Sequence, residues 1–508
     1  MLDKFLENNI QKKFQIFSIL YVSHSVLIKD LSKETKTSPA SIASLITELN
    51  FDLQGLAEIS KNSTTLRIEV YDETAFFDIF HAIYKNSDVL KCLCYMITND
   101  SHESFAEFPE EHYLTRPSAY RIRQNCVNYL HEIGLGVNKN KVTGNEYRIR
   151  FLIALLHYRY GVDCCNIDDH SIQMAREFVA ATNDKISVPF LERTSAEYGY
   201  SEYLLVLAWK RKDYPLTFEK SEELEKLKQL FIYDELKKYL KEHLENKLNI
   251  TFSEYDYDYI FLVYCCTNSC ILADKWTQKE IHLVHSIVFS NAKIKNLVKQ
   301  FEDQYGTAII QSHAFKSVII YFYKKCLFNL HCIIPDKHFY LDSKSDSSKL
   351  MVRQCITGII DTWKKENNIP YPVDDGHLQY LSLQIFSIIQ QFMEPVQIFI
   401  VSDLTSEFEI LKLYLTREFS QQRVTIRPVL FNAQDLSFMS SLNNSVIIVK
   451  KVFTSAVTAL GISEKNIIVP ITIEINDLDK KTIAESVVKC ETNTFRDFIL
   501  KQNEKRKN

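Results

Sequence analysis

Scarcity of glycine is the feature that most constrains this chain. It has 10 glycines among 508 residues, whereas average usage gives a chain of this length about 35. Nucleotide- and phosphate-binding folds use Gly-rich turns to bring the backbone against a ligand. Neither G-x-G-x-x-G, nor G-x-x-x-x-G-K-[ST], nor G-x-S-x-G occurs in the sequence. We therefore expect no cofactor and no enzyme activity.

The composition is that of a globular protein with several domains. Apolar residues make up 46% and charged residues 24%, and the net charge is -4. The uncharged runs are shorter than the roughly 20 residues that span a membrane, and the N-terminal MLDKFLENNIQKK has no signal-peptide core. The 12 cysteines include no C-x-x-C pair, which argues for reduced thiols rather than a metal site. We expect a cytoplasmic protein without a metal or a membrane partner.

Hydrophobic periodicity divides the chain into three parts. Residues 1–160 show short helices, two of them followed by a turn and a β-like segment. Residues 161–393 show longer amphipathic helices, including one predicted over residues 221–248, and a Ser- and Asp-rich loop at residues 340–350. After Pro395 the runs VQIFIV, VTIRPVL, SVIIVK and NIIVPITI alternate with helical or loop spacers. This alternation predicts a small α/β domain.

A first helix-turn-helix is predicted in LIKDLSKETKTSPASIASLITELNFDL, followed by a hairpin-like wing over residues 57–70. Ser38 is a good N-cap and Pro39 fits the first position of the second helix. This second helix presents polar side chains outward, which would contact DNA: Ser38, Ser41 and Ser44. Its outward face has no Arg or Lys, so a helical packing unit without a ligand is the alternative.

A second helix-turn-helix, in FAEFPEEHYLTRPSAYRIRQNCVNYLHEIG, has a stronger charge signal. Residues 115–150 hold seven basic and two acidic residues, a local charge of +5 in a slightly acidic chain. Such focusing is typical of a surface that contacts phosphates. The predicted major-groove residues are Arg116, Ser118, Arg121, Gln124 and Asn125. The predicted phosphate contacts are Arg123, Lys139, Lys141, Arg148 and Arg150, the last four in a predicted wing, LGVNKNKVTGNEYRIR. A solvated basic helix without a ligand is the alternative.

The segments YLTRPSAYRIRQNCVNYLHEIGLGV and VTGNEYRIRFLIALLHYRYG resemble the second DNA-binding domain of Mga/AtxA-type virulence regulators of Gram-positive bacteria. The resemblance implies a mainly α, multidomain, cytoplasmic transcription regulator that binds promoter DNA as a dimer or larger oligomer. It implies two N-terminal winged helix-turn-helix domains, two helical PTS-regulation domains (PRDs), and a C-terminal α/β domain like enzyme IIB of the sugar phosphotransferase system. The corresponding ranges are 1–70, 71–160, 161–278, 279–393 and 394–508.

PRDs of this family present histidines to the phosphocarrier protein of the phosphotransferase system. Where the resemblance places those histidines, this chain has Val263 in YDYDYIFLVYCC and Gln384 in DDGHLQYLSLQIFSII. Four other histidines are candidates for regulatory phosphorylation: His170, His285, His331 and His377. Each has a plainer interpretation as a helix-surface or half-buried histidine.

Enzyme IIB domains carry phosphate on a cysteine after their first strand, in a Gly-containing loop. In IFIVSDLTSEFEILKLYL, Ser402 stands at that position and the loop has no glycine. A serine without a base does not replace an activated thiolate, so we expect no phosphate transfer there. Two alternatives to a DNA-binding regulator remain: a phosphotransferase-linked sensor or protein-interaction module without DNA binding, and, less favoured, an RNA-binding PRD antiterminator.

Overall fold

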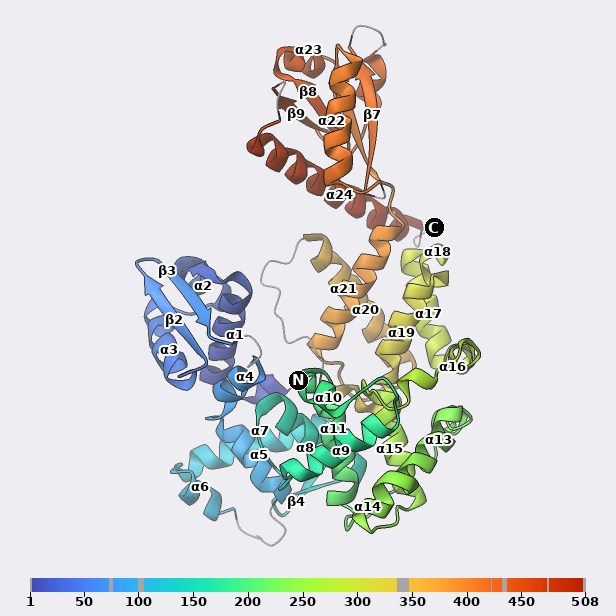
Figure 1. The fold of residues 1–508 in the computed structure, drawn as a ribbon. Coiled ribbons are helices and arrows are strands. Elements are labelled where there is room, and N and C mark those ends of the chain that lie inside the picture. The colour runs from blue at the N-terminus through green and yellow to red at the C-terminus, as the bar shows by residue number, and fades with distance from the viewer. Residues whose placement is uncertain are drawn as a thin grey trace. The chain divides into compact units, whose positions relative to one another are not determined.

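The structure is a computed structural model, and it describes residues 2–72, 76–98, 105–335, 347–421, 423–431, 436–472 and 475–505 (Figure 1). Most of these residues are helical. The chain forms two compact units. The first comprises residues 1–295, 319–344 and 364–380, and the second comprises residues 296–318, 345–363 and 381–508.

The N-terminal segment has the helices and the hairpin predicted for it. Its elements are η1 (Leu2–Phe5), α1 (Asn8–Ser23), β1 (Ser25–Leu27), α2 (Ile28–Thr35), α3 (Pro39–Asp52), β2 (Ala57–Asn62) and β3 (Thr65–Val70). The strands form an antiparallel sheet in the order β1-β3-β2. The Ser38 hydroxyl caps α3 by accepting from the Ser41 N–H. The Asn50 side chain fixes the hairpin to α3 by hydrogen bonds to both backbone groups of Ile59.

The next segment is a second helix-turn-helix with a short hairpin. It comprises α4 (Phe76–Tyr84), α5 (Asp88–Thr98), α6 (Glu107–Glu111), α7 (Arg116–Glu132), β4 (Gly136–Asn138), β5 (Lys141–Thr143) and α8 (Glu146–Tyr160). The hairpin turn uses left-handed backbone at Lys139 and Asn140. The predicted wing is shorter than expected. Residues 146–150 belong to α8, because 13 of the 15 residues of that helix are buried and their packing fixes it as a core element.

A helical region follows in the first unit. Its elements are α9 (Asp169–Ala181), α10 (Val188–Arg193), α11 (Ser195–Lys210), α12 (Glu222–Leu227), α13 (Phe231–Tyr239), the π-helical η3 (Leu240–Glu245), α14 (Asn246–Leu248), α15 (Glu254–Cys266), η4 (Ala273–Lys275) and α16 (Gln278–Ser290). The single helix predicted over residues 221–248 is wrong. The chain turns at residues 228–230, which lets Leu224 and Ile232 both become buried while Lys228 pairs with Asp258 of α15.

The remaining helices before the sheet are α17 (Ala292–Tyr305), α18 (Thr307–Gln311), α19 (His313–Lys324), η5 (Leu327–Cys332), α20 (Ser347–Glu366) and α21 (Asp375–Gln391). Most of the loop predicted at residues 340–350 lies outside the described residues. Its last four residues begin α20, so the loop prediction is wrong for them.

The C-terminal α/β domain predicted after Pro395 is present. It contains β6 (Val396–Ser402), α22 (Thr405–Glu418), β7 (Val424–Leu430), η6 (Leu436–Ser441), β8 (Val446–Lys450), η7 (Lys451–Phe453), α23 (Thr454–Thr458), β9 (Ile467–Ile471) and α24 (Asp477–Lys505). The strands are parallel, in the order β7-β6-β8-β9 (Figure 1). Alternate residues of each strand face α22 and α24 on one side and η6 and α23 on the other.

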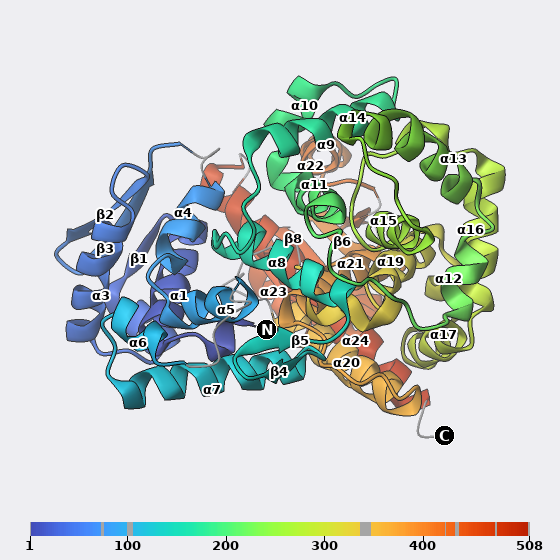
Figure 2. The same cartoon turned by 90° about the horizontal axis from the view of Figure 1, so that it is seen from below.

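The core of the first unit is continuous. One cluster of buried apolar residues runs from Leu2 through α8, α11 and α15 to Ile334. Figure 2 shows this unit from below, with α7, β4 and β5 at its lower edge. The second helix-turn-helix therefore shares its hydrophobic core with the helices that follow it. Among the described helices, none combines the length and the apolar character that a membrane crossing requires.

Candidate DNA-binding surface

Helix α7 is the main candidate for contact with DNA. Thr115 has extended backbone at its N-cap and a proline follows in the first turn, a combination that starts helices. The apolar stripe predicted for it is buried: Ala119, Ile122, Cys126, Leu130 and Ile133. Burial of this stripe fixes which side of α7 faces away from the core.

Three predicted major-groove residues lie on the outward face of α7. Arg116, Arg121 and Gln124 are exposed, and Gln124 donates to the Asn128 side chain at 2.9 Å. Ser118 is half-buried at the margin of this face. Asn125 is half-buried and donates to the carbonyl of Phe5 at 3.3 Å, so its prediction as a groove residue is wrong. Its amide holds the N-terminal segment against α7.

Two exposed tyrosines beside these residues are absent from the sequence prediction. Tyr113 is 97% exposed just before α7, and Tyr120 is 60% exposed on it. Tyr120 lies one turn beyond Arg116, on the same face of the helix. Exposed aromatic side chains at a basic surface are able to stack on or contact nucleotides. The polar residues around both tyrosines in HYLTRPSAYR are the sequence signal that could have predicted their exposure.

The predicted phosphate contacts separate into two groups. Lys139 is exposed and Lys141 is half-buried, both at the β4–β5 hairpin. Arg123 is half-buried and its Nε donates to the Asn140 side chain at 2.8 Å, so it joins α7 to the hairpin.

Arg148 and Arg150 are buried, with 3% and 0% of their surface exposed, so the prediction that they hold phosphates is wrong. Arg148 donates to the carbonyls of Ile133, Phe328 and Asn329. Arg150 pairs with Glu146 one turn earlier. The sequence shows the charge of these two arginines directly, whereas the burial of α8 depends on tertiary packing.

Helix α3 offers a weaker surface. Its predicted contact residues Ser38, Ser41 and Ser44 are all exposed. The hydroxyls of Ser38 and Ser41 lie 2.9 Å apart, and Ser38 also accepts from the Ser41 backbone. Phe51, near the end of the helix, is 77% exposed. This face is polar without being basic, as the sequence predicted.

Comparison with protein families decides the class of the chain. The model of the Mga helix-turn-helix domain matches residues 72–157. The model of the PRD domain of M protein trans-acting positive regulator (MGA) matches residues 172–382. The chain belongs to the Mga-type, PRD-containing transcription regulators. A comparison with curated proteins gave no match.

The PRD region of this Mga-type regulator keeps two of the four candidate histidines at or near its surface. His170 is exposed in the first turn of α9, and His285 is half-buried on α16. His331 and His377 are buried. The His377 ring accepts from Lys325 Nζ at 3.0 Å and its Nε2 donates to the Ile334 carbonyl. The Nε2 of His331 forms a hydrogen bond with the Tyr371 carbonyl. Desolvation lowers the pKa of His331 to about 4.

His331 and His377 are therefore closed to a phosphocarrier protein, and their prediction as phosphorylation sites is wrong. The two positions that the family resemblance assigns to histidines also differ in exposure. Val263 is buried and Gln384 is half-buried.

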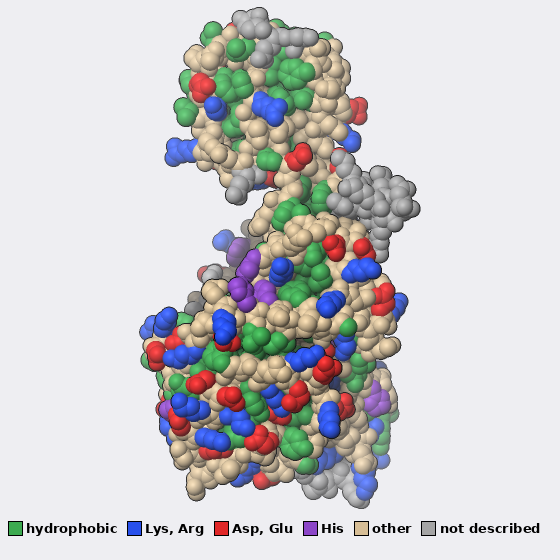
Figure 3. Space-filling model, turned by 90° about the vertical axis from the view of Figure 1, so that its right-hand side faces the viewer, with side chains coloured by type: hydrophobic (Ala, Val, Ile, Leu, Met, Phe, Trp, Pro, Cys, Tyr) green, Lys and Arg blue, Asp and Glu red, His purple; other side chains and the backbone are tan. Residues whose placement is uncertain are grey.

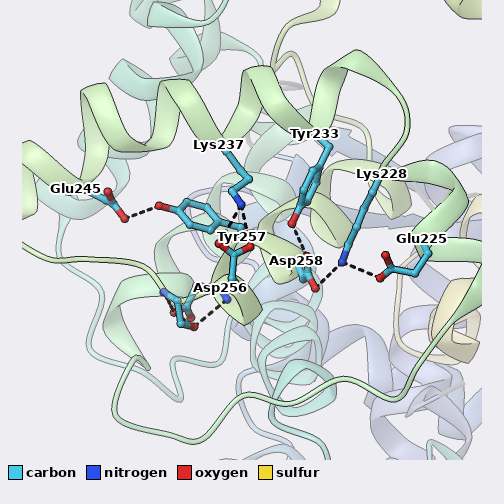
Figure 4. A network of polar contacts seen from close by, with 10 residues as sticks. Glu225, Lys228, Tyr233, Lys237, Glu245, Asp256, Tyr257 and Asp258 are labelled. Carbon is cyan, nitrogen blue, oxygen red and sulfur yellow. Dashed lines mark hydrogen bonds and ion pairs between the residues drawn. The ribbon is translucent and has the colours of Figure 1, made fainter.

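Acidic and aromatic residues at the start of α15 form a structural network (Figure 4). Asp258 accepts from Lys228 Nζ at 2.8 Å and from the Tyr233 hydroxyl at 2.7 Å. The Tyr257 hydroxyl donates to Glu245 at 2.8 Å. Ser253 and Asp256 form a capping box at the helix start. These carboxylates are used in holding α12 and α13 against α15.

Charge on the face of the molecule drawn in Figure 3 is mixed. Basic and acidic side chains alternate over its lower part, with no area of a single sign. The outward side of α7 differs, because its exposed charged residues are both arginines. Among the described residues, no group of three or more His, Cys, Asp or Glu side chains is arranged to hold a metal ion.

Ser402 ends β6 in the C-terminal domain and is buried. Its hydroxyl donates to the Leu404 carbonyl at 3.0 Å. Nearby, Lys450 Nζ pairs with Asp403 at 2.7 Å and Glu407 at 2.6 Å. Two carboxylates around one lysine leave this loop net negative, which opposes a phosphoryl group.

Proposed function

We propose that the protein is a DNA-binding transcription regulator that contacts promoter DNA through two winged helix-turn-helix domains. Helix α7 enters the major groove with Arg116, Arg121 and Gln124, and the β4–β5 hairpin touches the backbone. The observation that carries this proposal is the exposure of the two arginines and the glutamine on one face of α7. Arginine and glutamine are the side chains that form paired hydrogen bonds with base edges.

Helix α3 adds a second, weaker contact through its serines. Two weak DNA-binding domains in one chain bind the same DNA molecule more tightly than either alone, because binding of the first raises the effective concentration of the second. Oligomerisation would set the spacing of the recognition helices, because paired recognition helices bind half-sites that lie about one turn of the DNA helix, or a multiple of it, apart. We assign control to two PRDs and to an enzyme IIB-like domain, over residues 161–278, 279–393 and 394–508, after helix-turn-helix domains at 1–70 and 71–160.

The salt dependence of DNA binding tests this proposal quantitatively. With Arg148 and Arg150 buried and Arg123 bonded to Asn140, four of the seven basic residues over residues 115–150 are left as proposed phosphate contacts: Arg116, Arg121, Lys139 and Lys141. At about 0.9 per phosphate, four contacts give a slope of about −3.6 for each copy of this domain in a plot of log affinity against log salt. Affinity then falls about 150-fold between 50 and 200 mM salt.

The experiment is a gel-shift titration on A·T-rich promoter DNA at several salt concentrations. An Arg116→Ala/Arg121→Ala variant removes two of the four contacts and should lose about half of the slope that this domain contributes, whatever the oligomeric state. A Lys226→Ala/Lys247→Ala variant is the matched control, since both lysines lie on the PRD surface, paired with Glu222 and Glu177. A wild-type chain that does not shift DNA even at low salt would contradict the proposal.

A second candidate function is favoured by the exposure of His170. An imidazole in the first turn of α9, open to solvent, is able to accept a phosphoryl group from the phosphocarrier protein. The chain would then act as a phosphotransferase-linked sensor, with or without DNA binding. Radiolabel from phosphoenolpyruvate should appear on the wild-type chain and disappear in His170→Ala. Equal labelling of the two chains would exclude His170.

A further inference from the structure

A large cavity lies among the helices of the PRD region, within the first unit. Its volume is about 1180 Å³, which exceeds the 300–1,000 Å³ or so of typical small-molecule sites. Its walls come from α12, α15, α16, α19 and the segment that carries Trp276. Figure 2 shows α12 beside α16, with α15 and α19 on their inner side. No residue of the predicted DNA-binding surface lines it.

One wall of the cavity is apolar. Val284 and Ile287 of α16, Ile320 of α19, and Trp276 line it. Helix α16 carries several apolar residues, yet none of its residues is buried. Its apolar side therefore faces the cavity in place of a packed core. Such a surface gains free energy when an apolar group covers it, by about 25 cal/mol per Å².

The cavity lining also includes a half-buried ammonium group, that of Lys324. Lys324 Nζ donates to the Thr267 carbonyl at 3.0 Å and to Asn268 Oδ1 at 2.8 Å, and both residues also line the cavity. Neither partner is charged, and an ammonium has three donors. Desolvation, with the neighbouring charge of Lys325, lowers the pKa of Lys324 to about 8.

Four glutamates also line the cavity, Glu197, Glu219, Glu222 and Glu223, and Glu222 pairs with Lys226 at 2.6 Å. Glu223 accepts from Asn291 at 2.8 Å and from the Tyr323 hydroxyl at 3.0 Å, and Lys293 lies 3.7 Å away. Lys324 has no ion-pair partner among the described carboxylates. A half-buried charge without a counter-ion carries a desolvation cost, and an anion that entered the cavity would supply the counter-ion.

We propose that the cavity binds a small organic anion, whose charged head pairs with Lys324 and whose apolar body lies against Trp276, Val284 and Ile287. The shared chemistry is an anionic head group on an apolar body, in the form of a carboxylate or a phosphate monoester. This site goes beyond the proposed DNA-binding function, because it uses other residues and needs no DNA for its test.

The test uses the full chain and the anionic fluorophore 8-anilinonaphthalene-1-sulfonate, an apolar molecule with one negative charge. The dye should fluoresce with the wild-type chain, with energy transfer from Trp276. Sodium octanoate and octyl phosphate should compete, and neutral 1-octanol should compete poorly. The more effective of the two anions identifies the preferred head group.

Lys324→Met keeps the length of the side chain and removes the charge, so dye affinity should fall about 10-fold or more. The ligand-free variant should melt at the wild-type temperature or higher, since a half-buried charge without a counter-ion is gone. Val284→Trp should reduce dye binding by filling the cavity, and Lys412→Met, on α22, is the control. Equal dye affinity in wild type and Lys324→Met, or no dye binding to the wild type, would overturn the proposal.

Discussion

The buried charge cluster at the start of α8 allows a sharp test of what these arginines do. Glu146 Oε1 accepts from Arg150 Nε at 3.1 Å and from Arg211 Nε at 2.7 Å, and its Oε2 accepts from Arg211 Nη2 at 3.0 Å. The three side chains are 0–8% exposed. One carboxylate therefore balances two guanidinium groups. Glu146→Gln keeps the shape of this side chain and removes the only negative charge of the trio.

Removing the charge of Glu146 leaves the positive charges of Arg150 and Arg211 buried together without a counter-ion. Removing one partner of a buried ion pair lowers the free energy of unfolding by about 3–5 kcal/mol. With a urea m-value of about 3 kcal/mol/M, the midpoint of unfolding should fall by about 1–1.7 M. Trp209, buried on α11 two residues from Arg211, provides a fluorescence signal for this unit.

Glu222→Gln is the matched control, because Glu222 is 83% exposed and pairs with Lys226 one turn away on the surface. Loss of this surface ion pair should lower the free energy of unfolding by less than about 1 kcal/mol. The salt slope of DNA binding should stay at the wild-type value in the folded Glu146→Gln variant. A midpoint within 0.3 M or so of the wild type would refute this account of the trio, at the m-value assumed above.

Two further predictions concern His331 and Ser402. His331 has a folded pKa of about 4 and an unfolded pKa near 6.5, so its contribution to stability should be constant above pH 6.5 and fall by about 3 kcal/mol as the pH drops to 4. Urea midpoints measured over this range should show that loss, and His331→Gln should flatten it. Incubation with the phosphotransferase phosphocarrier system should leave Ser402 unlabelled, since its hydroxyl is buried and bonded to Leu404; phosphoserine at this position in a peptide map would contradict this.

Local patterns in the sequence predicted the elements that local interactions determine. Ser38 and Pro39 mark the start of α3, and the alternation after Pro395 marks all four strands of the parallel sheet. The stripe from Ala119 to Ile133 gives the correct inward face of α7. In each case, periodicity and capping chemistry are properties of neighbouring residues, so the sequence carries them directly.

Partners that lie far apart in the chain were not predictable in the same way. Asn125 meets the carbonyl of Phe5, 120 positions earlier. The break in the helix predicted over residues 221–248 accompanies an ion pair between Lys228 and Asp258, 30 positions later. No local pattern encodes these pairings, because tertiary packing selects them over local propensity. The domain boundaries and the oligomeric state remain predictions.

Arg148 shows what such a long-range pairing contributes to the architecture. Its Nε donates to the carbonyl of Ile133, the residue that caps the C-terminal end of α7, at 2.6 Å. Its two terminal nitrogens donate to the carbonyls of Phe328 and Asn329, at 3.0 and 2.8 Å. Those two residues have left-handed backbone, with φ of 50° and 56°, a conformation that asparagine tolerates and that is uncommon for phenylalanine.

Phe328 and Asn329 also line the cavity that contains Lys324. One buried guanidinium therefore joins a wall of that cavity to the end of the helix that we propose reads DNA. Because α8 is buried in the common core, no flexible linker separates the two regions. A displacement of the Phe328–Asn329 backbone would break two of the three hydrogen bonds that Arg148 donates to carbonyl groups. The positive charge that suggested a phosphate contact instead joins the end of α7 to the Phe328–Asn329 backbone.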